Sequence, residues 1–126
     1  KCYPGQLNQV FMNILSNAID ALEEEYESLD SKDWQPEIRI VTEPAEGDKI
    51  SIHICDNGPG VPADLLEKIF DPFFTTKAVG KGTGLGMSIS HEIISEKHHG
   101  SICCQRIEPQ GTKFTITIPT FQNIAD

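Results

Sequence analysis

The first 29 residues place their hydrophobic side chains at spacings of three and four, the period of a helix with one buried face. This pattern predicts a helix from Gln6 to about Leu29, the longest periodic segment of the chain. Two asparagines, Asn13 and Asn17, stand one turn apart inside it and share one side of the helix. The apolar face consists of Leu7, Val10, Phe11, Ile14, Leu15, Ala18, Ile19 and Leu22.

Two segments that alternate hydrophobic and polar residues follow, at 37–43 and 49–55. Because alternation is the period of a strand, they predict an antiparallel hairpin joined by the loop PAEGD. Two further strands are predicted at 101–108 and 112–119, separated by PQG. The residues of the first hairpin expected to face the core are Ile38, Ile40, Ile50, Ile52 and Ile54.

Glycine and proline interrupt the chain between the two strand pairs. DNGPGVP predicts a loop, and ADLLEKIF after it predicts a short amphipathic helix at 63–70. The segment 71–86 has no clear period, and loops of this length are usually functional. A helix is then predicted over 87–100, with Gly100 as its C-cap. This order predicts an α+β sandwich with helices on one face of a mixed or antiparallel sheet.

Composition narrows the class of protein. With 126 residues, of which 38% are hydrophobic and 23% charged, the chain fits one soluble globular domain. No apolar run approaches the roughly 20 residues of a membrane span, so we expect no membrane contact by this segment. The net charge of −9 argues against a nucleic-acid partner. The first residues lack the order of a signal peptide and suggest a cut from a longer chain.

Four cysteines occur, and none is spaced as in a zinc site or a C-x-x-C motif. Cys55 and Cys103 lie in predicted strands, where we expect them to pack as small hydrophobic side chains. Reduced cysteines indicate a cytoplasmic location, and whether the parent protein is membrane-anchored stays open. An acidic stretch at 23–33 extends the first helix or its exit loop, and the sequence assigns it no role.

The amides and the first glycine-rich loop contain side chains suited to ligand binding. Asn13 and Asn17 need hydrogen-bond partners, and taken alone they are explained most simply as satisfied core or capping amides. Asp56 ends a predicted strand, where its carboxylate can accept hydrogen bonds from a ligand. Gly58 and Gly60 let the backbone turn sharply and approach that ligand closely, although a plain turn also explains them.

The sequence GKGTGLG places alternate glycines directly before the helix predicted at 87–100. Exposed N–H groups at a helix start form an anion site suited to phosphates. The segment has neither the ending of a Walker A loop nor the preceding strand of a Rossmann turn. A flexible linker is the alternative, and the helix that follows at once disfavours it.

In combination these features are far more specific than singly. An asparagine-bearing helix, D-x-G-x-G, IFDPFFTTK, G-x-G-x-G before a helix, and GTKFTITIP in the last strand together resemble the catalytic, ATP-binding domain of sensor histidine kinases. The resemblance covers essentially all 126 residues and implies one domain, 1–126, without the domain that carries the acceptor histidine. It also implies a two-layer α/β sandwich of Bergerat type, a mixed, mostly antiparallel sheet of about five strands covered on one face by about three helices.

The resemblance implies ATP and Mg²⁺ as cofactors. Asn17 would ligate Mg²⁺ through its side-chain oxygen, and Asn13 would help to hold the phosphates or a metal-bound water. Asp56 would accept a hydrogen bond from the adenine amino group, and Thr112 would lie near the adenine and its water. The glycines that line the base pocket would be Gly58 and Gly60.

The resemblance also makes the long loop a lid over the nucleotide. Phe70, Phe73 and Phe74 are similar to phenylalanines that anchor such a lid, with ordinary core packing as the alternative. Lys77 and Lys81 would reach the phosphates across the lid or remain solvated. The backbone amides expected to meet the β and γ phosphates belong to Gly82, Thr83, Gly84, Leu85 and Gly86.

Asn13 also bears on the class of reaction. Hydrolytic relatives typically carry a Glu there that activates water, whereas a carboxamide cannot take a proton at neutral pH. The resemblance therefore implies a histidine kinase that transfers the γ-phosphoryl group of Mg·ATP to a His on a separate dimerisation domain, for relay to a response regulator receiver domain. We expect a monomeric isolated domain and a homodimeric parent. The alternatives are an ATPase of the same fold that couples hydrolysis to conformational gating, and a degenerate nucleotide-binding module.

Overall fold

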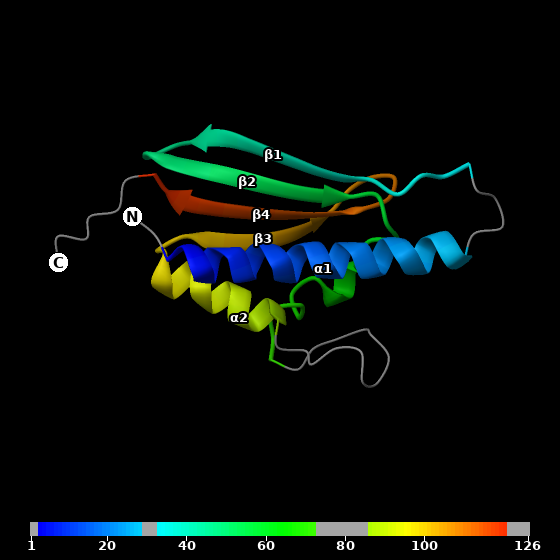
Figure 1. Cartoon of the computed structure of the whole chain (residues 1–126), viewed down its shortest axis with the longest axis horizontal. Coiled ribbons are helices and arrows are strands. Elements are labelled where there is room, and N and C mark those ends of the chain that lie inside the picture. The colour runs from blue at the N-terminus through cyan, green and yellow to red at the C-terminus, as the bar shows by residue number, and fades with distance from the viewer. Residues whose placement is uncertain (1–2, 29–32, 73–85, 121–126) are drawn as a thin grey trace.

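The computed structural model of the chain describes residues 3–28, 33–72 and 86–120, with elements in the predicted order (Figure 1). Helix α1, the predicted first helix, spans Pro4–Ser28, and the second predicted helix begins as α2 at Gly86–Glu92. The remaining elements are β1 (Ile38–Ala45), β2 (Lys49–Asp56), the 3₁₀ helix η1 (Ala63–Leu65), the π-helix η2 (Ile93–Lys97), β3 (Ser101–Arg106) and β4 (Thr112–Pro119).

The four strands within the described residues form one sheet in the order β1-β2-β4-β3, and every neighbouring pair is antiparallel. In the register, Ile54 of β2 lies between Ile40 of β1 and Phe114 of β4. Both labelled helices lie on the same side of the sheet, and α2 runs beside α1 (Figure 1). The predicted α+β sandwich, with helices on one face of the sheet, is therefore confirmed.

The core lies between α1, α2 with its π-helical continuation, and the helix-facing side of the sheet. Val10 and Ile14 of α1, Ile94 of η2 and Ile116 of β4 are each at most 1% exposed. Burial of each such side chain contributes roughly 1.5–3 kcal/mol to folding. The buried faces that the helical and strand periods predict therefore form a single core. The side of α1 that carries Asn13 faces α2.

Two strand residues are placed differently from the prediction. Ile40 shares the face of Ile54 but is 56% exposed, because β1 is an edge strand whose interior residues are all exposed. Cys103 is exposed on the opposite face of the sheet, and its neighbour Cys104 packs against the core instead. Burial raises the pKa of Cys104 to about 12, so its thiol stays protonated and unreactive at neutral pH.

The helix predicted at 63–70 is shorter than expected. Only Ala63–Leu65 forms a helix, of the 3₁₀ type, and turns follow it. The backbone N–H groups of Leu65, Lys68 and Asp71 each donate to the carbonyl three residues earlier, at 2.9 Å. Ile69 is nevertheless only 6% exposed, so these turns pack on the core without forming a regular helix.

The second helix also ends differently from the prediction. Gly100 was expected as its cap, but His99 takes the left-handed conformation, with φ 55°. Gly100 donates its backbone N–H to the carbonyl of Ile94 at 2.9 Å. A Cβ atom on Gly100 would lie 2.2 Å from the carbonyl oxygen of Thr117, so close approach to β4 requires glycine here.

Gly100→Ala should lower the free energy of unfolding by at least about 2 kcal/mol, because a backbone carbonyl cannot rotate away from the added methyl group. Gly5→Ala is the matched control, since a Cβ there meets nothing within 4 Å. Urea denaturation of both variants measures the difference. Equal stability of the two variants would contradict the packing of Gly100 against β4.

Candidate functional site

Asn13 joins the two long helical segments of the domain. Its side-chain Nδ2 donates to the carbonyl oxygen of Gly86 and to Oγ of Ser90, both at 3.1 Å. Gly86 is the first residue of α2 and the last residue of the predicted phosphate segment. The polar side of α1 therefore faces the end of the glycine segment.

Asn17 lies one turn further along the same side of α1 and is half-buried. One turn further along, α1 lies against Gly58 of the DNGPG loop. A Cβ atom added to Gly58 would lie 3.5 Å from Leu22 Cδ2 and 3.8 Å from Ala21 Cβ. Because Asn13 contacts Gly86, Asn17 lies on α1 between the contact with Gly86 and the contact with the DNGPG loop.

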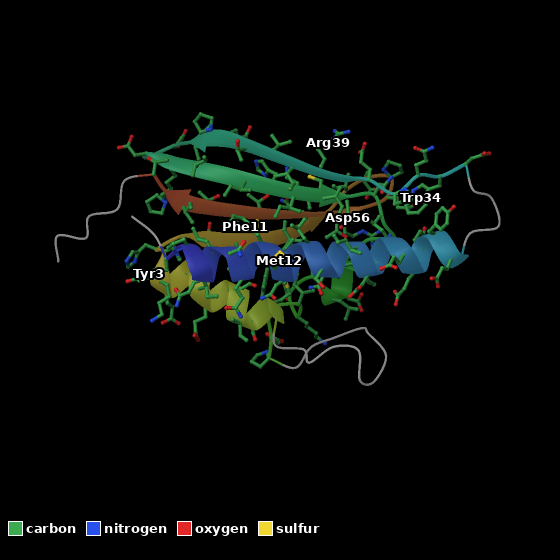
Figure 2. All side chains as sticks on the ribbon, viewed as in Figure 1. Tyr3, Phe11, Met12, Trp34, Arg39 and Asp56 are labelled. Carbon is green, nitrogen blue, oxygen red and sulfur yellow. The ribbon has the colours of Figure 1, made fainter. Side chains whose placement is uncertain are left out.

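Asp56 is the last residue of β2 and faces α1 (Figure 2). Its side chain is only 9% exposed, and its Oδ1 accepts the backbone N–H of Gly58 at 2.9 Å. Desolvation raises the pKa of this carboxyl, and backbone hydrogen bonds from Gly58 and Thr112 oppose that shift. Thr112, 6% exposed, is the cross-strand partner of Asp56, so the two predicted base-binding residues are neighbours.

Close backbone contacts explain the glycines around Asp56. Gly60 has φ +82°, and a Cβ atom on it would lie 2.9 Å from the carbonyl oxygen of Gly111. Gly111, in turn, would place a Cβ atom 2.3 Å from the carbonyl oxygen of Asp56. The loop after β2 thus packs on the turn before β4, at the end of the two central strands where Asp56 and Thr112 lie.

Gln110 makes contacts that no sequence pattern indicates. Its side-chain Nε2 donates to Oε2 of Glu25 at 2.9 Å and to the carbonyl oxygen of Asn57 at 3.2 Å. One residue of the acidic stretch at the end of α1 therefore holds the loop that follows Asp56. Gln110 lies in a turn with no period, so no local pattern marks it.

Ser90 was also missed, although a signal for it existed. It is fully buried and occupies an apolar position of the second helix, between the buried residues Met87 and Ile94. A small polar residue at such a position has to find a hydrogen-bond partner. The same argument that singled out Asn13 and Asn17 applies to it.

Phe70 packs within the described domain. Its ring centroid lies 5.5 Å from that of His91 on α2 and 6.4 Å from that of Phe114 on β4. Phe70 therefore packs against the core, and its role as a lid anchor stays a prediction. The other predicted lid and phosphate residues lie outside the described residues: Phe73, Phe74, Lys77, Lys81, Gly82, Thr83, Gly84 and Leu85.

Across the described ranges, no helix is both long and apolar enough to cross a membrane. The same ranges contain no cluster of three or more His, Cys, Asp or Glu side chains suited to a metal ion.

Comparison with known proteins agrees with this geometry. Residues 2–122 match the family described as histidine kinase-, DNA gyrase B-, and HSP90-like ATPase. Sporulation kinase E of Bacillus subtilis is 38% identical over 97% of the chain, and the sensor kinase CckA of Brucella abortus is 41% identical over 91%. The chain spans only 15% and 12% of these two relatives.

Solved structures lead to the same family. The catalytic domain of histidine kinase ThkA superposes with a TM-score of 0.75 and 34% identity, over 94% of this chain and 70% of that one. ThkA in complex with the response regulator protein TrrA matches with a TM-score of 0.68 and 33% identity, over 91% and 28% of the two chains. The chain therefore belongs to the histidine kinase-, DNA gyrase B- and HSP90-like ATPases, as an ATP-binding catalytic domain of the sensor histidine kinase type.

Proposed function

We propose that this domain binds Mg·ATP and transfers its γ-phosphoryl group to a histidine on a separate dimerisation domain, from which a response regulator receives it. The proposal rests on one side of α1, which carries Asn13 and Asn17. This side contacts Gly86 at one point and, two turns further along, the DNGPG loop that begins at Asp56. A nucleotide would lie along this side of α1, with its base at Asp56 and its phosphates near Gly86.

Asp56 is the residue that would recognise the base. Backbone N–H groups of Gly58 and Thr112 hold its carboxylate, and a carboxylate has about four acceptor positions in all. The remaining positions can accept from the exocyclic amino group of adenine. Because the carboxyl is buried, such a hydrogen bond forms in a weakly screened environment and favours a base that donates there.

Asn17 would provide a protein oxygen to the metal. Mg²⁺ prefers hard oxygen ligands and usually combines one or two protein groups with nucleotide phosphates and waters. An amide oxygen on a half-buried helix face fits that donor set. When bound, the ion neutralises charge on the phosphates during in-line transfer. The protein contributes positioning, through α1 and the start of α2.

Asn13 would keep water from being activated. A carboxamide holds no proton-accepting group at neutral pH, so nothing at this position can act as a general base. The bound γ-phosphoryl group therefore persists until an acceptor histidine arrives. We place the transfer in the cytoplasm, in a homodimeric parent whose isolated catalytic domain is monomeric. The complex of ThkA with its response regulator supports a receiver domain as the downstream partner.

The proposal is tested by incubating the domain with γ-labelled ATP and the dimerisation domain of the parent protein. Label should appear on the acceptor as phosphohistidine, stable in base and labile in acid, and free phosphate should stay low when the acceptor is absent. Steady phosphate release without acceptor, abolished by changing one carboxylate, would instead favour the gating ATPase.

Asn13→Glu should raise acceptor-independent ATP hydrolysis by about tenfold or more, since a well-placed general base typically contributes 10²–10⁴-fold. Asn13→Gln is the control, because it has the same length as Glu and no basic group. Phosphate release is followed for both variants at saturating ATP. Equal rates would leave Asn13 with a positioning role only.

A further inference from the structure

The contacts of Asn13 fix which end of its amide points away from α2. Nδ2 lies 3.1 Å from the carbonyl oxygen of Gly86 and 3.1 Å from Oγ of Ser90. The Ser90 hydroxyl in turn donates to the same Gly86 carbonyl at 2.8 Å. The three groups therefore form a closed hydrogen-bonded triangle between α1 and α2.

Only one orientation of the amide satisfies this triangle. A backbone carbonyl can only accept, so the end of the amide that faces Gly86 has to be the NH₂ group. The single hydroxyl proton of Ser90 goes to Gly86, so Ser90 accepts from Asn13 and does not donate to it. Nδ2 is therefore the donor to both acceptors, and Oδ1 is the end of the amide that points away from them.

We propose that Ser90 is a positioning residue that locks Asn13 with its carbonyl oxygen toward the nucleotide, where it accepts a hydrogen bond from a metal-bound water. This inference rests on the proposed function. Of the two roles left open for Asn13, it favours contact with a metal-bound water, because Nδ2 is engaged by α2 and Oδ1, which only accepts, is the end left for the nucleotide. It also ties the first turn of α2 to the face of α1 that carries the metal ligand.

A second serine in the same helical region provides a comparison. Ser95 donates to the carbonyl of His91 at 2.7 Å, the same bond to the residue four positions earlier that Ser90 makes to Gly86. Ser95 is half-buried and its hydrogen bond is exposed, whereas Ser90 is 0% exposed and also accepts from Asn13. The contact with Asn13, and not the bond within the helix, is what distinguishes the two serines.

The test measures binding of a non-hydrolysable ATP analogue by calorimetry, with Mg²⁺ and with EDTA. Ser90→Ala should weaken binding about five- to tenfold with Mg²⁺ and leave binding in EDTA unchanged, since the orientation acts through the metal-bound water. Ser95→Ala should match the wild type under both conditions. In an Asn13→Ala background, Ser90→Ala should cause no further loss. Ser90→Cys, with a weaker donor of similar size, should give an intermediate affinity.

Four results separate the possible failures. A loss of equal size in EDTA, or a loss that persists in the Asn13→Ala background, would overturn the positioning role. Unchanged affinity of a folded Ser90→Ala or Ser90→Cys variant with Mg²⁺ would overturn it as well, while the proposed function would stand. Absence of binding by the wild-type domain would reject the proposed function itself.

Discussion

Asp56→Asn should weaken ATP binding by at least about tenfold and leave the nucleotide-free domain at least as stable as the wild type. The new amide oxygen can still accept the backbone N–H of Gly58, which lies 2.9 Å from Oδ1, and removal of the buried charge offsets the weaker contact with the Thr112 N–H. The amide would present an NH₂ group where the adenine amino group needs an acceptor, and a buried donor facing a donor costs about one to three kcal/mol. The effect on binding is therefore large, whereas the fold loses little.

The pH dependence of stability tests the same residue independently. Burial raises the pKa of the Asp56 carboxyl above its ordinary value of 3.8. A carboxyl with a raised pKa in the folded state contributes stability below its ordinary value and loses that contribution as pH rises through the raised value. Asp56→Asn removes this dependence, so the stability of the variant relative to the wild type should increase as pH rises above 3.8.

Urea denaturation between pH 4 and pH 7, together with calorimetry of ATP binding, measures both effects. Asp48→Asn is a suitable control, because Asp48 is exposed and its left-handed backbone, with φ 57°, suits asparagine equally well. Wild-type ATP affinity in Asp56→Asn would remove this carboxylate from the base site. A large loss of stability would instead give it a structural role.

Asn17→Ala should reduce the rate of phosphohistidine formation by at least about a hundredfold. Under the proposed function, removing the amide oxygen takes away a metal ligand that would position the phosphates, and misplaced phosphates cannot reach in-line geometry. Asn17→Asp retains an oxygen at the same position, so it should keep more activity than Asn17→Ala. Ser16→Ala, an exposed neighbour on α1, should transfer at the wild-type rate.

The initial rate of labelling of the acceptor domain is the relevant measurement for these variants. Thermal unfolding of each variant should stay within a few degrees of the wild type, because Asn17 lies outside the buried stripe of α1. Transfer by Asn17→Ala at the wild-type rate would exclude Asn17 as the metal ligand, and the Mg²⁺ site would then need other donors.

The spacing of hydrophobic residues predicted the helices and strands of this fold well, because each of them contributes one face to a single core. The stripe through Val10, Ile14 and Ala18 determines which side of α1 is buried. The same stripe leaves Asn13 and Asn17 on the adjoining side, where Asn13 contacts α2. The Asp56 and Thr112 pair follows from two strands whose patterns were clear, although their register is a property of the assembled sheet.

The features that the sequence did not predict depend on contacts between distant segments. Ile40 has the correct period for a core residue and is exposed only because β1 forms the edge of the described sheet. The Gln110 contact joins residues 85 positions apart, and no local pattern specifies such a pair. The carbonyl of Thr117 makes glycine necessary at position 100, which neither strand nor helix period could indicate.

Calorimetric titration of the purified domain with a non-hydrolysable ATP analogue tests the central claim most directly. The account predicts one binding site per chain, weaker binding when EDTA replaces Mg²⁺, and loss of at least about nine-tenths of the affinity in Asp56→Asn. Absence of binding in the presence of Mg²⁺ would contradict the account and would leave a domain that retains the fold without the nucleotide site.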